Sequence, residues 1–158
     1  MLSRMKRRYS ISDYQDAVSL IRDLSGSSNA PINRSVGFPG ESDQEFEQSY
    51  DFCQRMEFAR IHVFPYSPRR ETQAAQMPQQ VKDRVKKQRS QRMLALAREG
   101  AQSFSRRFLG ETVLVLGEKP IGDNLWSGLT DNYIKVYIKS NKDLTNQLLL
   151  VKLMEVTQ

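Results

Sequence analysis

The side chains best suited to chemistry in this chain are one cysteine, Cys53, and one histidine, His62. An iron-sulfur cluster or a structural zinc needs three or four ligands, so these two residues cannot hold either. Cys53 falls on the apolar face of a predicted helix, which favours a small core residue over a nucleophile. His62 alternates with apolar neighbours on a predicted strand and has no evident partner. With no Ser-His-Asp set, Walker loop or paired carboxylates, we predict no catalytic residue and no metal ligand.

Two loops could bind a ligand through backbone and polar groups. The segment Gly37-Phe38-Pro39-Gly40-Glu41 lies between a predicted strand and a predicted helix, where glycines admit close approach and the helix start favours anions. The segment Tyr66-Ser67-Pro68-Arg69 follows the next strand, at the end that carries ligands in α/β barrels. The alternatives are an ordinary strand-to-helix loop with a good cap, and a proline-stiffened loop with a solvated arginine.

The clearest compositional signal is a basic window from Lys82 to Arg92. Its basic residues, against the single acid Asp83, are Lys82, Arg84, Lys86, Lys87, Arg89 and Arg92. Further basic residues follow at Arg98, Arg106, Arg107, Lys135 and Lys139, and the aromatic residues Trp126, Tyr133 and Tyr137 accompany the last of them. Basic side chains neutralise phosphates and aromatic rings can stack on bases, which favours RNA. A charge run is also commonly just a solvated helix face, and the aromatic rings can instead fill a small core.

The elements that position these residues divide into two kinds. Apolar spacing predicts a helix over 10–24, broken by the small and polar residues 25–29, and a strand near 32–38. Ser42 and Glu45 form a capping-box pattern that begins a second helix. A strand over 58–64 follows. Helix and strand alternate, so we expect a parallel α/β sheet with crossover helices, too short to close a barrel.

The second half of the chain changes pattern. Pro78 is predicted to open a long helix that stops at Gly110. Short β segments then follow, separated by turn signals, at 112–116, 125–129, 133–138 and 147–156. These predict a small antiparallel barrel or sheet of the OB-like size class.

Composition narrows the class of protein. The chain has 158 residues, a net charge of +6 and a pI of about 9.6. The charge favours a polyanionic partner. No stretch reaches the ~20 apolar residues of a membrane helix. The basic start is not followed by an apolar run, so it is not a secretory signal, and we expect a cytoplasmic protein without a membrane partner.

Several segments, in order, resemble the radical-SAM methylthiotransferase family. They are residues 4–9, the segment 36–41 with Phe46, the segment 62–69 with 72–78, Arg89, and the segment 128–133. The segment 62–69 looks most like the branch acting on N6-threonylcarbamoyladenosine in tRNA. The strand before Gly37 departs from the family pattern: a threonine and an aspartate followed by apolar residues are usual there, and this chain has Pro31, Ile32, Asn33, Arg34 and Ser35.

The resemblance implies a C-terminal fragment: a partial radical-SAM TIM-type barrel over 1–77, a connecting basic helix over 78–108, and an OB-like TRAM domain over 109–158 that binds the tRNA anticodon arm. Residues 147–158 fit the last TRAM strand, so we expect a complete C-terminus. Family members add a methylthio group to an adenosine beside the anticodon, using S-adenosyl-L-methionine and 4Fe-4S clusters. Their cysteine motif is missing here, so the N-terminal half would lie upstream or on a separate chain.

The resemblance also assigns roles to residues. We expect the cofactor-facing positions to be Gly37, Phe38, Pro39, Gly40, Glu41, Tyr66 and Ser67. We expect the RNA-binding positions to be Arg69, Lys82, Lys86, Lys87, Arg89, Arg92, Arg106, Arg107 and Lys135. No cofactor is expected to bind this chain stably, and the chain alone should be inactive. The alternatives are a stand-alone RNA-binding module, a fragment of the sister enzymes that modify a ribosomal protein, and a truncated product without function.

Overall fold

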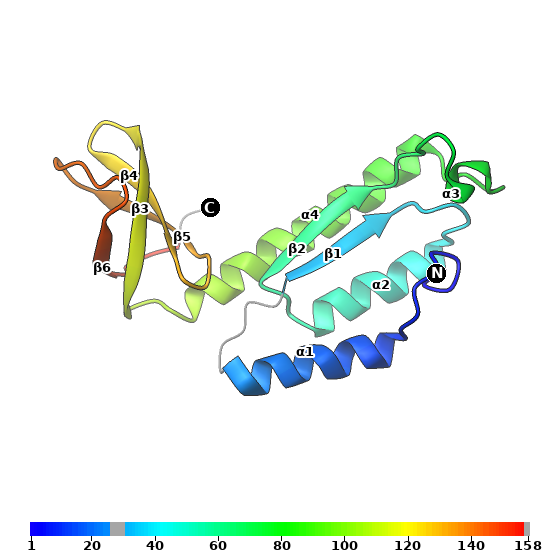
Figure 1. Ribbon diagram of the computed structural model, residues 1–158, viewed down its shortest axis with the longest axis horizontal. Helices are drawn as coiled ribbons and strands as arrows, with labels where there is room; N and C mark the ends of the chain where they lie inside the picture. The colour runs from blue at the N-terminus through cyan, green and yellow to red at the C-terminus, as the bar shows by residue number, and fades with distance from the viewer. Residues whose placement is uncertain (26–30, 157–158) are drawn as a thin grey trace. The chain divides into compact units, whose positions relative to one another are not determined.

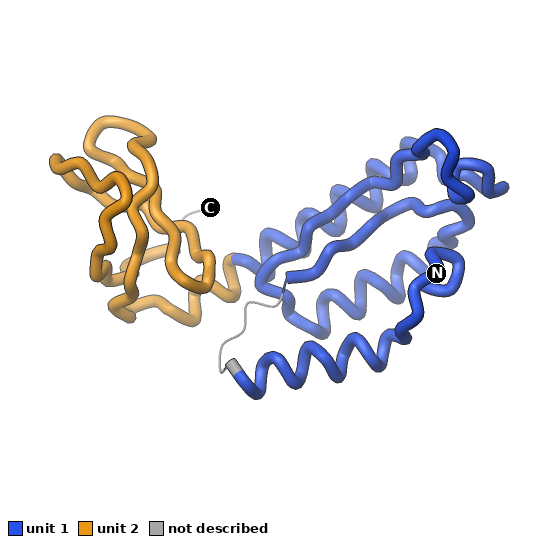
Figure 2. The backbone as a smooth tube through the Cα atoms, in the orientation of Figure 1, with its two compact units in different colours: residues 1–101 blue, residues 102–158 orange. Residues whose placement is uncertain are grey.

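The computed structural model describes residues 1–25 and 31–156, which divide into two compact units, 1–101 and 102–158 (Figure 2). The first unit begins with α1 (Ile11–Ser25), β1 (Pro31–Val36), α2 (Asp43–Arg55) and β2 (Arg60–Pro65) (Figure 1). The short helix α3 (Gln73–Gln76) and the long helix α4 (Asp83–Arg106) follow. The sequence predicted that residues 25–29 end the first helix. Of these, residues 26–29 lie outside the described residues.

The predicted parallel arrangement in the first unit is confirmed. β1 and β2 pair in parallel from Pro31 opposite Arg60 to Val36 opposite Pro65, and α2 connects them. A core of buried side chains gathers from α1, α2, α4, the two strands and the turn between α2 and β2: Val18, Val36, Phe46, Phe52, Cys53, Met56, Phe58, Ile61, Met93 and Leu96. Because Met93 and Leu96 come from α4, much of the segment expected to connect two domains is part of the first unit.

The predicted capping box at the start of α2 is also confirmed. The Ser42 hydroxyl accepts from Glu45 N at 3.1 Å, and the Glu45 carboxylate accepts from Ser42 N at 3.1 Å. Partial burial raises the pKa of Glu45, but hydrogen bonds from the Arg4 guanidinium and the Ser42 backbone outweigh this and hold the pKa at about 2. The N-terminal segment is therefore attached to the first turn of α2 by charged hydrogen bonds from Arg4 and the Met1 amino group to Glu45.

The prediction that the long helix begins at Pro78 is wrong. α4 begins at Asp83 instead. Gln79 has a left-handed φ of +61°, and its carbonyl accepts from Gly40 N at 2.9 Å. This segment therefore forms a turn against the loop 37–41 before the helix can begin.

The second unit is a curled, four-stranded antiparallel sheet. Its strands are β3 (Thr112–Gly122), β4 (Leu125–Thr130), β5 (Lys135–Lys139) and β6 (Leu148–Lys152), in the order β5-β4-β3-β6. The strand predicted over 112–116 extends to Gly122, with register shifts after Gly117 and Pro120. The strand predicted from Tyr133 begins at Lys135, because Tyr133 has φ +62° in a turn closed by Thr130 and Ile134. The described strands form a sheet rather than a closed barrel.

Candidate functional site

The loop between β1 and α2 lies at the carboxyl end of the parallel strands, where α/β proteins carry ligands. Gly37 has φ +77°, a conformation that favours glycine. Tyr66 follows β2 at the same edge, and its backbone N–H donates to Val36 O at 2.7 Å. The rings of Phe38 and Tyr66 meet edge to face, with centroids 5.5 Å apart. The structure thus brings together the two segments that the sequence singled out.

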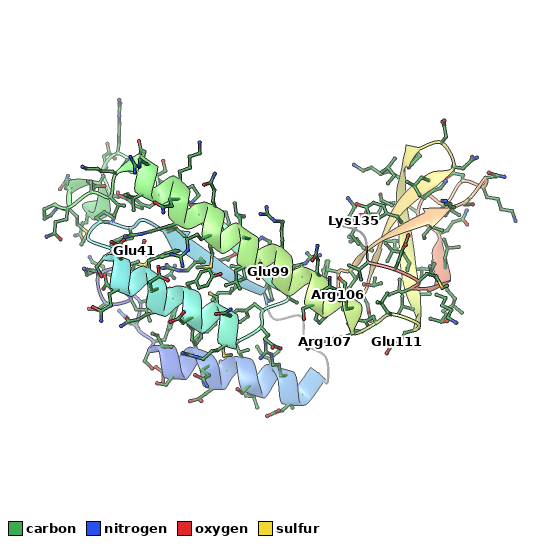
Figure 3. All side chains as sticks on the ribbon, turned by 180° about the vertical axis from the view of Figure 1, so that it is seen from behind. Glu41, Glu99, Arg106, Arg107, Glu111 and Lys135 are labelled. Carbon is green, nitrogen blue, oxygen red and sulfur yellow. The ribbon has the colours of Figure 1, made fainter. Side chains whose placement is uncertain are left out.

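Glu41 is the centre of this edge, and its side chain is fully buried (Figure 3). Its carboxylate accepts from Gly37 N at 2.6 Å, from Arg34 Nη2 at 2.7 Å and from Arg89 Nη1 at 2.9 Å. The same Arg89 nitrogen donates to the Glu41 backbone carbonyl at 3.0 Å, and Arg89 Nη2 donates to Asp43 at 2.6 Å. One carboxylate therefore joins β1, its loop and α4.

Lys86 covers the loop from α4. A Cβ added to Gly37 would lie 2.2 Å from Lys86 Cγ, so the lysine stem occupies the space beside the glycine. Lys86 Nζ donates to Tyr66 O at 3.3 Å, pairs with Asp83 at 2.8 Å and lies 6.0 Å from the Tyr66 ring centroid. The close approach that Gly37 permits is used by the chain's own lysine.

The residues at this edge do not fit S-adenosyl-L-methionine as they stand. The backbone N–H of Gly37 already donates a hydrogen bond to the Glu41 carboxylate, and that of Gly40 donates to Gln79 O. The side chain of Lys86 covers Gly37. Cys53 does not fit a cluster ligand either. Its side chain is enclosed by the apolar residues of the core, as predicted, so its sulfur is not accessible to a cluster, and burial raises the pKa of its thiol to about 11. Residues 1–25 and 31–156 contain no group of three or more candidate metal ligands.

The structure separates the predicted RNA-binding residues into two sets. The exposed set is Arg69, Lys82, Lys87, Arg106, Arg107 and Lys135, and Arg92 is exposed as well but pairs with an acidic side chain. Arg89 is only 6% exposed, and its bonds to Glu41 and Asp43 leave it an internal role in this arrangement. Lys86 is mostly covered, and Arg92 is bonded to Glu47 over the rings of Phe46 and Tyr50. The sequence could not distinguish these sets, because the acidic partners of Arg89 and Arg92 lie more than forty residues away in sequence.

The aromatic residues of the second unit also divide. Tyr133 is 58% exposed and Tyr137 is 44% exposed, and Lys135 Nζ lies 5.6 Å from the Tyr137 ring centroid. Trp126 is half-buried and pairs across the sheet with Ile138, whose neighbour in sequence, Tyr137, points to the other face. The rings of Tyr133 and Tyr137 are therefore exposed, while Trp126 lies on the opposite face of the sheet from Tyr137.

One surface was not singled out from the sequence. Leu114 pairs with Leu150 and Leu116 pairs with Leu148, and all four side chains are exposed. Residues directly opposite in an antiparallel pair share a face, so these leucines form an apolar patch on β3 and β6. In β3, Leu114 and Leu116 alternate with Val113 and Val115, so the strand is apolar on both faces. This pattern is the sequence signal that could have revealed the patch.

The fold defines a class of chain with a parallel α/β unit followed by a small antiparallel β unit. None of the described helices is both long and apolar enough to cross a membrane. No family model matches the chain. Individual relatives do. The chain is 32% identical over 159 residues to the threonylcarbamoyladenosine tRNA methylthiotransferase MtaB of Bacillus subtilis, covering 98% of this chain and 35% of that protein.

Two further relatives give the same result. The MtaB protein of Thermotoga maritima is 31% identical over 142 residues, which cover 90% of this chain and 33% of that protein. The tRNA-2-methylthio-N(6)-dimethylallyladenosine synthase of Francisella tularensis is 32% identical over 157 residues, covering 98% and 36%. The chain is homologous to the tRNA methylthiotransferases, and it spans about a third of the length of the curated relatives it matches.

Proposed function

We propose that this chain is the C-terminal portion of a tRNA methylthiotransferase and that its contribution to the reaction is to bind tRNA. The observation that carries this proposal is the match to tRNA-modifying relatives over 98% of the chain. On this proposal, the α/β unit is the last part of a radical-SAM barrel and the β unit is a TRAM domain. The substrate would be a threonylcarbamoyl-adenosine beside the anticodon, because the first of these relatives acts on that nucleoside by name.

The supporting chemistry is positive charge beside exposed rings. Lys135 and Lys139 flank Tyr137 on β5, and Tyr133 precedes them in the turn. Lysines contact phosphates and tyrosines stack on unpaired bases, which together suit a single-stranded loop. The chemistry of the whole enzyme would come from S-adenosyl-L-methionine and 4Fe-4S clusters held by residues outside this chain.

The first test is RNA binding by the full chain. We expect it to bind a tRNA anticodon stem-loop, with log affinity falling with log salt at roughly −0.7 per neutralised phosphate. Several contacts give a loss of about tenfold or more between low and physiological salt. Filter binding over a salt series measures this, with a fully paired duplex of equal length as the control. Binding that is missing at low salt, or indifferent to salt, would contradict the proposal.

The second test concerns the cofactors. The protein, reconstituted anaerobically with iron and sulfide, should show no stoichiometric cluster absorption and should not cleave S-adenosyl-L-methionine. The reason is the ligand count: the sequence has one cysteine, whereas these clusters take several thiolates. Substitution of Cys53 by serine should leave the absorption spectrum unchanged. A cluster band that disappears in that variant would overturn the expectation.

The alternative function is a stand-alone RNA-binding module without any catalytic partner. This alternative also predicts that the chain binds RNA. The two functions are distinguished by adding an N-terminal methylthiotransferase half to the chain. Restored methylthio transfer to tRNA by the mixture, measured by mass spectrometry of digested nucleosides, favours the enzyme. Its failure, with RNA binding intact, favours the module.

A further inference from the structure

Helix α4 carries two sets of basic side chains with different environments. Lys86 pairs with Asp83 of the same helix, whereas Arg89 and Arg92 turn toward the loop 37–41 and α2, where Glu41 and Glu47 neutralise them. These cations are part of the packing of the first unit. The packing of the first unit accounts for these three cations, but it does not account for the basic residues on the opposite side of α4.

The opposite side of α4 is cationic and rich in amides. At 3.6 residues per turn, one arc of the helix collects five exposed residues. They are Arg84, Lys87, Gln88, Gln91 and Arg98, which we call the α4 outer face. The buried residues Arg89, Met93 and Leu96 lie on the other side of the helix.

Carboxylates are excluded from the centre of this face. The acidic residues of α4 are Asp83 and Glu99, and helical periodicity places both at the flanks of the arc. Asp83 is already paired with Lys86, at 2.8 Å. Among the described residues, the centre of the outer face therefore carries no acidic side chain of α4, unlike the inner set, whose cations are paired.

The geometry of the face suits an extended polyanion. From Arg84 to Arg98 the helix rises about 21 Å, so its cations are spread along a line rather than gathered at one point. Arginine and lysine side chains contact phosphates, and glutamine amides donate to phosphate and sugar oxygens. A single small anion would use only one end of this surface.

We propose that the α4 outer face is a phosphate-binding surface for RNA, separate from the exposed tyrosines of the second unit. This inference rests on the proposed function. It assigns RNA contacts to Arg84, Lys87 and Arg98, and it gives Lys86 and Arg89 an internal role. The face lies within residues 84–98 of the first unit, so RNA binding does not depend on the β unit alone.

The test compares two triple variants of the full chain against the anticodon stem-loop. One is Arg84→Gln, Lys87→Gln and Arg98→Gln. The control is Arg7→Gln, Arg8→Gln and Arg55→Gln, which removes the same charge from exposed residues elsewhere in the first unit. We expect the α4 variant to lose about tenfold or more in affinity at low salt, with a salt slope smaller by about 2. The control should change the slope by less than half as much.

The outcomes separate the two proposals. No binding by the unaltered chain overturns the proposed function and this inference with it. Binding that falls equally in both variants overturns only this inference, because the RNA then responds to overall charge. Circular dichroism of both variants checks that their helices are intact. With intact helices, a loss of affinity confined to the α4 variant supports the α4 outer face.

Discussion

Replacing Glu41 with alanine is expected to lower the free energy of unfolding of the first unit by about 3–5 kcal/mol. The carboxylate is fully buried and neutralises Arg34 and Arg89, whose side chains are 12% and 7% exposed. Its removal takes the carboxylate acceptor away from two largely buried cations and from the N–H of Gly37, and it leaves Arg89 with the exposed Asp43 as its acidic partner. Urea denaturation followed by helical ellipticity measures the change, because α1, α2 and most of α4 belong to this unit.

A matched control is available in the ion pair between Glu47 of α2 and Arg92 of α4. Glu47 accepts two hydrogen bonds from Arg92, but the two side chains are 47% and 45% exposed. Glu47→Ala should therefore change the stability by less than about 1 kcal/mol. Glu41→Gln keeps the shape and removes the charge, and it should also destabilise the unit clearly. If Glu41→Gln unfolds at the same urea concentration as the unaltered chain, the buried charge does not hold this edge together.

Local signals predicted much of the first unit. The capping box at Ser42 and Glu45 and the alternation of helix and strand each depend on neighbouring residues, and the structure confirms them. The role of Glu41 depends instead on Arg34 and Arg89, which are 7 and 48 residues away in sequence. Spacing cannot reveal such a cluster. Arg34 is one of the five residues that depart from the family pattern, and the structure explains it as the second cation of this carboxylate.

The basic helix shows the same limit. The sequence indicated an excess of positive charge from Lys82 onward, and the exposed residues Arg84 and Lys87 agree with a charged surface. It could not show that Lys86 and Arg89 turn inward, because that depends on where α2 and the loop 37–41 pack. In the second unit, turn signals predicted four strands. The part of β3 beyond Leu116 was missed because the register shifts after Gly117 hide the alternation.

Gly117 occupies a position where the second unit leaves no room for a side chain. A Cβ added there would lie 2.1 Å from the carbonyl oxygen of Leu144, which belongs to the backbone. The residue cannot easily move away, because Gly117 N donates to Gln147 O at 2.9 Å and Gly117 O accepts from Asn146 N at 2.9 Å. Any shift that relieves the contact must therefore break at least one of these bonds, and it disturbs the buried side chain of Leu144.

Gly117→Ala is accordingly expected to destabilise the second unit by about 3–5 kcal/mol, from overpacking and the two weakened hydrogen bonds. Gly122→Ala, at the end of the same strand, meets nothing within 4 Å and should change the stability by less than about 1 kcal/mol. Fluorescence of Trp126, the single tryptophan, follows unfolding of this sheet in urea. Because the sheet carries Lys135 and Tyr137, Gly117→Ala should also weaken binding of the anticodon stem-loop, leaving the contribution of the α4 outer face. Equal unfolding midpoints for the two glycine variants would show that the Leu144 carbonyl does not approach β3 at this point.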